Sequence, residues 1–325
     1  MYYKEVCLRD KIGEFLCEFA ENDSRIYVID SDLAKSTKTL IFKEKFPNRF
    51  IEVGIAEASA VSIAEGLASE GQIPFYVNFA TFVTGTAWTQ VRQSAYANSN
   101  VKLIGTYVGM DNGPDGASHH ANEDIALMRM IPNMKILVPS NVKELKQAIK
   151  IAIEYDGPVY VRATRDVVPD VDLEQNVEMG KSIVVKDNGN DFALIYEGTT
   201  AGLAYKSFET LKEKGYKGKL VNIFSIKPID IDLINNLASN VGGIITLENH
   251  SIIGGLGGAI AEIIAQKNTH APIKYVGVGD VFTESGKAVD VKTKYGLNVD
   301  NVVEKVQEIL KKEKWFDYKN KKSEK

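Results

Sequence analysis

Short apolar runs alternate with helical patterns along most of this 325-residue chain, and this alternation restricts its fold more than any other feature. In the first half, the apolar runs 25–30, 101–107 and 158–162 are separated by segments of helical periodicity, such as 141–155. Strands that are separated by helices form mostly parallel sheets with helices on both faces. The same alternation returns after residue 190. We therefore predict an α/β protein of two doubly wound domains.

The predicted domains are residues 1–170 and 191–313. A linker over 171–190 is expected from its weak periodicity and its many Asp, Glu, Gly and Asn residues, and the lysine-rich tail over 314–325 is expected to fray. Two domains are ordinary for this length. The expected strands are 25–30, one from 73, 101–107, 135–139, 158–162, 192–196, 218–223, 243–247 and 274–278; the expected helices are 9–22, 60–68, 84–97, 122–130, 141–155, 202–215, 257–267 and 299–312.

The composition argues against several classes of function. The 39 basic and 43 acidic residues give a net charge of −4, so the chain has no general basic field for nucleic acid. No apolar run reaches the roughly 18 residues that a membrane-spanning helix needs. Cys7 and Cys17 are too few to form a metal cluster alone, and they fit a reducing, cytosolic environment.

Glu57 stands where an apolar strand end, Val53–Ala56, meets a helix of small and apolar residues. Apolar residues recur in this helix at positions 60, 61, 63, 64, 67 and 68, so most of its faces are expected to be buried. A carboxylate at the entrance of such a helix either caps it or is held away from water for chemistry. The residues alone leave both interpretations open.

Other candidate residues follow predicted strands or occupy a loop. Asp30 and Asp32 come at the end of the first strand, at the edge where open parallel sheets bind ligands. His119 follows the loop 111–116, whose Asn, Gly and Pro residues exclude regular structure. Histidine suits proton transfer near neutral pH because its unperturbed pKa is about 6.5.

Several separate motifs, in order along nearly the whole chain, resemble the transketolase family. They are residues 32–39, 54–57, 79–82, 113–119, 248–257 and 284–286. More narrowly, the chain resembles the C-terminal subunit of a split transketolase, in which a pyrimidine-binding domain precedes a C-terminal domain.

The resemblance implies that the chain binds thiamine diphosphate, whose chemistry the protein tunes. Glu57 would contact the ring nitrogen of the aminopyrimidine and so promote loss of the proton on the thiazolium carbon. Phe79 and Phe82 would form the aromatic pocket for the aminopyrimidine, although Phe82 also fits ordinary core packing. Asp32 would lie beside the reactive ring, with Asp30 as the alternative acid.

The resemblance also implies a set of substrate contacts. Asp115 and His119 match the pair that binds sugar hydroxyls near the reacting carbons. Arg165 matches an arginine that binds a sugar phosphate, which its planar guanidinium suits. Arg9 and Ser36 align more loosely with other phosphate contacts, and Arg9 also fits a surface salt bridge.

Two positions depart from the family pattern. His120 stands where the family usually has glutamine, so it either assists His119 or faces solvent. Tyr107 stands where members that use sugar phosphates commonly have histidine; a phenol donates one hydrogen bond but carries no positive charge at neutral pH. Tyr107 therefore leaves the acceptor open.

The cofactor's diphosphate and its Mg²⁺ require a Gly-Asp-Gly motif that this sequence lacks. Pro114 precedes Asp115-Gly116, and Val281 follows Gly279-Asp280. We therefore expect no metal ligands in this chain, and a separate N-terminal subunit that carries the diphosphate-binding domain. The expected assembly is α₂β₂ around a homodimer core, and the chain alone is expected to be inactive. The turn 253–257 resembles a phosphate loop only superficially, since it lacks the Gly-Lys-Ser/Thr ending.

The expected reaction is transfer of a two-carbon ketol unit from a ketose to an aldose. One alternative is the β subunit of a 2-oxo acid dehydrogenase, whose usual Glu-Ile-Gln-Phe segment is replaced here by Tyr76–Phe79. Another is a transketolase-like enzyme of deoxyxylulose phosphate or unusual sugar synthesis, which Tyr107 keeps open. A non-catalytic scaffold is the third, and the intact set of Glu57, Asp115 and His119 argues against it.

Overall fold

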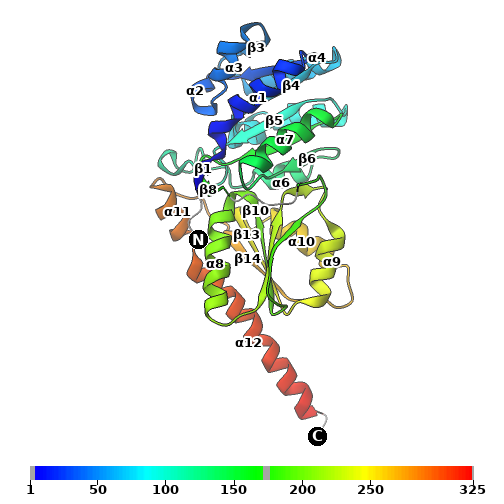
Figure 1. Cartoon of the computed structure of the whole chain (residues 1–325), viewed down its shortest axis with the longest axis vertical. Coiled ribbons are helices and arrows are strands. Elements are labelled where there is room, and N and C mark those ends of the chain that lie inside the picture. Colours follow the sequence, from blue (N-terminus) through cyan, green and yellow to red (C-terminus); the bar gives the residue numbers. More distant parts are fainter. Residues whose placement is uncertain (1–3, 171–175, 324–325) are drawn as a thin grey trace.

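The computed structural model describes residues 4–170 and 176–323, which form two α/β units in succession along the chain (Figure 1). Each unit has its own sheet with helices on both faces. The prediction of two doubly wound domains with mostly parallel sheets is therefore confirmed. Within these ranges, no helix is long and apolar enough to cross a membrane.

The first sheet has seven strands in the order β12-β6-β7-β5-β4-β2-β3, and all of its neighbours are parallel except β12 and β6. Its interior strand β4 (Ile73–Phe79) is buried along its whole length, as expected for a parallel strand with helices on both sides. The other strands are β2 (Ile26–Asp30), β3 (Phe50–Glu52), β5 (Lys102–Thr106), β6 (Lys135–Leu137), β7 (Val159–Ala163) and β12 (Ser225–Lys227).

Alternate side chains of these strands enter two different cores, because successive residues of a strand point to opposite faces. Tyr76 packs on the face of α4 (Glu57–Ser69), α5 (Trp88–Tyr96) and α6 (Asp124–Arg129). Its neighbours Phe75 and Val77 pack on the face of α1 (Ile12–Asn22), α3 (Leu40–Lys45) and α7 (Val142–Glu154). The remaining elements are η1 (Leu8–Lys11), α2 (Ala34–Thr37), η2 (Pro47–Arg49), η3 (Phe82–Thr86) and η4 (Gly113–Asp115).

The second sheet has five strands in the order β14-β13-β10-β11-β9, of which only β9 is antiparallel to its neighbour. Its strands are β9 (Ile183–Asp187), β10 (Phe192–Glu197), β11 (Gly218–Ile223), β13 (Ile244–Ser251) and β14 (Ile273–Val278). The associated helices are η5 (Gly198–Thr200), α8 (Ala201–Glu213), α9 (Ile231–Asn240), α10 (Leu256–Ile264), α11 (Ala288–Lys294) and α12 (Val299–Ser323).

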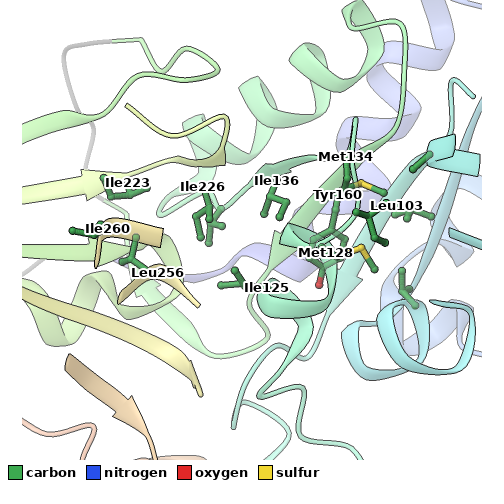
Figure 2. Close-up of a cluster of buried hydrophobic side chains, with 14 of the residues drawn as sticks. Leu103, Ile125, Met128, Met134, Ile136, Tyr160, Ile223, Ile226, Leu256 and Ile260 are labelled. Atoms are coloured by element: carbon green, nitrogen blue, oxygen red, sulfur yellow. The ribbon is translucent and has the colours of Figure 1, made fainter. Parts of the chain in front are cut away.

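The two units share a continuous apolar core. Figure 2 shows Leu103 and Tyr160 of the first unit in one cluster with Ile223, Leu256 and Ile260 of the second. Strand β12 belongs to the second half of the chain but pairs with β6, and so extends the first sheet. The relative position of the two units is thus fixed by both packing and backbone hydrogen bonds.

A buried ionic network also joins the units. Arg162 of β7 is fully buried and donates to Asp124 at 2.8 Å, to Glu197 at 3.1 Å and to the backbone oxygen of Asn249 at 2.7 Å. Burial alone would lower the pKa of Arg162, but the carboxylates of Asp124 and Glu197 raise it above its ordinary value. A charge taken out of water is tolerated only when it is paired in this way.

Three predicted segments differ from the structure. The segment 171–190, which is expected to be a linker, contains strand β9. This strand forms because it pairs with β11 and because Ile183 packs into the core. Residues 171–175 of that segment lie outside the described residues, and the domain boundary itself stays a prediction. The helix expected over 84–97 begins as a π-helical turn, η3, before α5.

The expected frayed tail over 314–325 is wrong for most of its length. Helix α12 continues to Ser323 and extends away from the rest of the molecule (Figure 1). Its sequence has no Gly or Pro from Val299 to Ser323, so nothing in it stops a helix.

Candidate functional site at the carboxyl ends of the first sheet

The candidate residues lie mostly just beyond the carboxyl ends of parallel strands. Phe79 ends β4 and is in register with Thr106 of β5, which is in register with Ala163 of β7. Tyr107 and Arg165 follow these last two strands directly, and Asp32 follows β2. Residues that are far apart in sequence therefore meet at one edge of the sheet, where open parallel sheets bind ligands.

An aromatic group forms the centre of this edge. The rings of Phe79 and Tyr107 are 3.9 Å apart between centroids, and those of Phe79 and Phe82 are stacked at 5.9 Å. His119 meets Phe82 edge-on at 5.4 Å, which brings the loop of residues 111–122 to the same place. The alternative interpretation of Phe82 was ordinary core packing. Its side chain is only partly buried, so Phe82 is part of this aromatic surface instead.

Two arginines flank Tyr107. Arg9 donates from Nη1 to the phenol oxygen at 2.6 Å, and the Cζ atoms of Arg9 and Arg165 lie 5.3 and 5.0 Å from the centre of the phenol ring. Antiparallel pairing of β1 (Glu5–Cys7) with β8 (Val167–Pro169) explains how they meet. Arg9 follows β1 and Arg165 precedes β8.

Arg9 also has an acidic neighbour. Its guanidinium donates to Asp10 at 2.8 and 3.2 Å, so the expected alternative of a salt bridge describes part of its contacts. Burial lowers the pKa of Arg9, but the bond to Asp10 and the neighbouring phenol raise it overall. With Arg165 close by, the two guanidinium charges exceed the single charge of Asp10, and the group is suited to an anion.

Ser36 is not joined to this group. In the part of the chain that the structure describes, its hydroxyl makes no hydrogen bond with Arg9, Tyr107 or Arg165. It lies in the short helix α2, whose following residue Lys38 is 3.6 Å from Asp10. The role of Ser36 as an anion contact stays a prediction.

Glu57 is the first residue of α4 and is 9% exposed. Among the described residues, no backbone N–H donates to its carboxylate, so Glu57 does not cap the helix by a hydrogen bond. It does stand in the first turn, where the helix dipole favours an acid. Among the described residues its carboxylate has no hydrogen-bond or ion-pair partner. Burial raises the pKa of Tyr76 in β4, and the negative charge of Glu57 adds to this effect.

The two acids after β2 have different environments. Asp30 is fully buried and accepts from the backbone N–H of Leu33 at 2.7 Å and from the hydroxyls of Thr37 and Thr39 at 2.9 and 2.8 Å. It therefore holds the turn into α2. Asp32 is exposed and has a left-handed backbone with φ 63°. Among the described residues its carboxylate has no hydrogen-bond or ion-pair partner, and its role beside a cofactor ring stays a prediction.

The loop of Asp115 and His119 combines exposed and buried residues. Asp115 is exposed, and His119 is partly buried with its Nδ1 atom 2.9 Å from the hydroxyl of Ser118. One of the two interpretations of His120 was that its ring faces solvent, and this is wrong. His120 is 3% exposed, and its Nδ1 atom is 2.5 Å from the hydroxyl of Thr283 in the second unit. Burial lowers the pKa of His120, which favours the neutral ring.

The turn 253–257, which superficially resembles a phosphate loop, is occupied by a side chain of the protein. The backbone N–H groups of Leu256 and Gly257, at the start of α10, donate to the carboxylate of Glu248 at 2.6 and 3.0 Å. Burial raises the pKa of Glu248 to about 8. A helix N-terminus that already holds an internal carboxylate has no room for a phosphate.

Sequence reasoning missed the polar residues that connect the two units. Arg162 interrupts an apolar strand, and a charged residue in such a run is a signal of a buried pair. Glu144 gives no comparable signal, because it occurs in an ordinary amphipathic helix. It accepts from Ser140 and from Asn222 of β11, and burial raises its pKa to about 7.

The fold is that of a two-domain α/β protein, with its candidate site at the carboxyl edge of the first sheet. Residues 4–170 match the family described as transketolase, pyrimidine binding domain, and residues 180–302 match transketolase, C-terminal domain. The chain belongs to the transketolase family.

Similar proteins show which part of a transketolase the chain corresponds to. A putative transketolase C-terminal section of Methanocaldococcus jannaschii is 39% identical over 94% of this chain and 97% of its own length. A 6-deoxy-6-sulfo-D-fructose transketolase subunit of a Clostridium species is 34% identical over 95% of this chain and 96% of its own length. A solved structure described as a split gene transketolase, inactive beta4 tetramer, is 39% identical with a TM-score of 0.86, over 94% of this chain and 99% of that one. The chain thus corresponds to the C-terminal section of a split transketolase.

Proposed function

We propose that this chain is the C-terminal subunit of a heteromeric, thiamine-diphosphate-dependent transketolase. It would take part in moving a two-carbon ketol unit from a ketose, or its phosphate, to an aldose, or its phosphate. The observations that carry this proposal are the buried carboxylate of Glu57, which has no partner among the described residues, and the aromatic group of Phe79 and Phe82 in the same domain of a chain of this family. Bound thiamine diphosphate would supply a nucleophilic carbon for the transfer.

The residues present fit the aminopyrimidine end of that cofactor. A planar, nitrogen-containing ring suits the stacked pair of Phe79 and Phe82, and a ring nitrogen suits the carboxylate of Glu57, which lacks an internal partner. Glu57 would hold a proton at that ring nitrogen. Asp32 would lie near the reacting end of the site.

Substrate recognition is assigned to the residues around Tyr107 and His119. Asp115 and His119 would bind sugar hydroxyls, with His119 held in place by its contact with Phe82. Arg9, Arg165 and the phenol of Tyr107 would bind an anionic end of the substrate. Ser36 would add a further contact once a ligand is bound, and His120 would assist His119.

The diphosphate and Mg²⁺ ends of the cofactor would be held by a partner. The sequence contains no Gly-Asp-Gly motif, and no group of three or more potential metal ligands occurs among the residues with described side chains. We infer an N-terminal subunit with the diphosphate-binding domain, in an α₂β₂ assembly around a dimer of this chain. The description of a similar solved chain as inactive supports the expected lack of activity without that partner.

The two free cysteines, Cys7 and Cys17, favour a cytoplasmic location.

Reconstitution tests the proposal. The chain is co-expressed with a candidate diphosphate-domain subunit encoded at the same locus, and ketol transfer is measured over a panel of phosphorylated and unphosphorylated sugars, with and without thiamine diphosphate. Turnover that requires both chains and the cofactor is the expected result. A stable complex without ketol transfer to any sugar would contradict the proposal, and acyl transfer to a lipoyl carrier would favour 2-oxo acid chemistry.

A further inference from the structure

The loop that carries Asp115 and His119 is bound by the second unit at several points along its length. At its start, the side chain of Asn249 accepts from the backbone N–H of Met110 at 3.0 Å and donates to Asp111 at 2.8 Å. At its end, the backbone N–H of Ser251 donates to the backbone oxygen of Asn122 at 2.7 Å. Both contacts are buried or partly buried, and both anchor the loop to strand β13.

A second segment, residues 283–288, closes over the middle of this loop. The backbone N–H of Gly286 donates to the backbone oxygen of Gly113 at 3.0 Å. A Cβ atom on Gly113 would lie 2.6 Å from backbone atoms of Gly286 and Ala288. A Cβ on Gly116, whose φ is +74°, would overlap with the side chain of Ser285. The two backbones are therefore in direct contact, and glycine is required on the loop side.

Thr283 makes the side-chain contact of this segment with the loop. Its hydroxyl oxygen accepts from the Nδ2 atom of Asn122 at 3.2 Å and shares a hydrogen bond with Nδ1 of His120 at 2.5 Å. Thr283 and His120 are each 3% exposed, so water competes little for this bond. Because His120 directly follows His119, whatever fixes the ring of His120 also fixes the backbone on which His119 is carried.

We propose that Thr283 is a positioning residue for ketol transfer, which orients the loop of Asp115 and His119 through its hydrogen bond to His120. This inference rests on the proposed function. Through this bond the second unit would take part in the reaction. Displacement of a binding group by about 1 Å lowers the rate of an enzyme by up to about 100-fold, so the bond has a measurable effect.

The test compares three variants in the complete complex, with partner subunit, thiamine diphosphate and Mg²⁺, using the pair of sugars with the highest turnover in the panel. Thr283→Val removes the hydroxyl and keeps the shape, and Thr283→Ser keeps the hydroxyl. Thr293→Val is the matched control, because the hydroxyl of this exposed threonine bonds only to the backbone of its own helix at Val289. Hydrogen–deuterium exchange of residues 111–122 is measured in the same complexes.

We expect Thr283→Val to lower kcat/KM per assembled site about 10- to 100-fold and to increase exchange in the loop about fivefold or more. Thr283→Ser should stay within about threefold of the unmodified complex, and Thr293→Val should match it. A merely structural role would reduce the yield of complex but leave kcat/KM per assembled site unchanged. Unchanged kcat/KM and unchanged exchange in Thr283→Val would overturn the inference.

A second variant tests the bond from its other side. His120→Leu should lose a similar factor, and the double variant should lose little more than either single variant, since all three lack the same bond. Fully additive losses would contradict action through His120. If Thr283→Val does not assemble, His120→Leu replaces it in the comparison. Absence of ketol transfer in the unmodified complex would refute the proposed function, whereas loop exchange would still test the contact with Thr283.

Discussion

Removal of the Tyr107 hydroxyl should weaken binding of anionic sugars selectively. The phenol oxygen accepts from Arg9 at 2.6 Å, so the hydroxyl hydrogen is left to donate to a bound anion. In Tyr107→Phe the ring remains, and with it the contacts to Phe79 and to the guanidinium of Arg165. The substitution therefore changes the hydrogen bond while it keeps the packing.

The expected magnitude follows from the charge and exposure of the group. A hydrogen bond to a charged partner contributes about 1.5–3 kcal/mol. Arg9 keeps its bonds to Asp10, and its side chain is 13% exposed, so the lower part of that range applies. We expect KM for a phosphorylated sugar to rise about 10- to 30-fold, because about 1.4 kcal/mol corresponds to a factor of ten. The value of kcat should change by less than about threefold.

The assay is steady-state ketol transfer by the complete complex, with each phosphorylated sugar compared with its unphosphorylated counterpart. The unphosphorylated sugar should have the same KM in the variant and in the unmodified protein. An equal rise of KM for both sugars would show that Tyr107 acts on the ring pocket rather than on an anion. No change for either sugar would refute the anion site around Tyr107.

Two further predictions concern Glu144 of the first unit and Gly255 of the second. Glu144 has a pKa of about 7, raised by burial from an ordinary value of 4.5, so the folded state binds its proton more tightly and loses this stabilisation as pH rises from about 4.5 through 7. Urea unfolding should therefore show the free energy of unfolding of Glu144→Gln increasing relative to the unmodified chain between pH 5 and 8, and a difference independent of pH would contradict this origin. Gly255→Ala should lower the thermal unfolding midpoint, because a Cβ there overlaps with the carboxylate of Glu248, whereas Gly258→Ala in the same helix meets nothing nearer than 3.6 Å and should not lower it. Equal midpoints for the two variants would argue against Glu248 as the anchor of that turn.

The strands and most helices were predictable because their signals are local. The fully buried strand β4 is apolar except for Asn78, and α7 has regular helical periodicity with Asn141 as its N-cap. Strand β12 was missed because its three residues have no pattern of their own, and it forms only by pairing with β6. The length of α12 was missed because a polar composition was taken as a sign of fraying, although nothing in the sequence interrupts the helix.

The candidate site was predictable in its members but not in its contacts. The sequence offered Arg9 and Tyr107 as separate candidates, and only the structure joins them by a hydrogen bond between residues 98 positions apart. It also distinguishes Asp30, which holds a turn, from Asp32, which is free. The contact of His120 with Thr283 spans 163 positions, and no local pattern reports such a distance.

Glu57→Gln in the reconstituted complex tests the central claim most directly. A glutamine of the same shape cannot carry the charge that favours a proton at the ring nitrogen of the cofactor, and loss of such a group lowers rates about 100- to 10,000-fold. Glu70→Gln, an exposed residue directly after the same helix, is the matched control. The account predicts a loss of ketol transfer in that range for Glu57→Gln, with intact assembly and with full activity of the control. Full activity of Glu57→Gln in an assembled complex would contradict it.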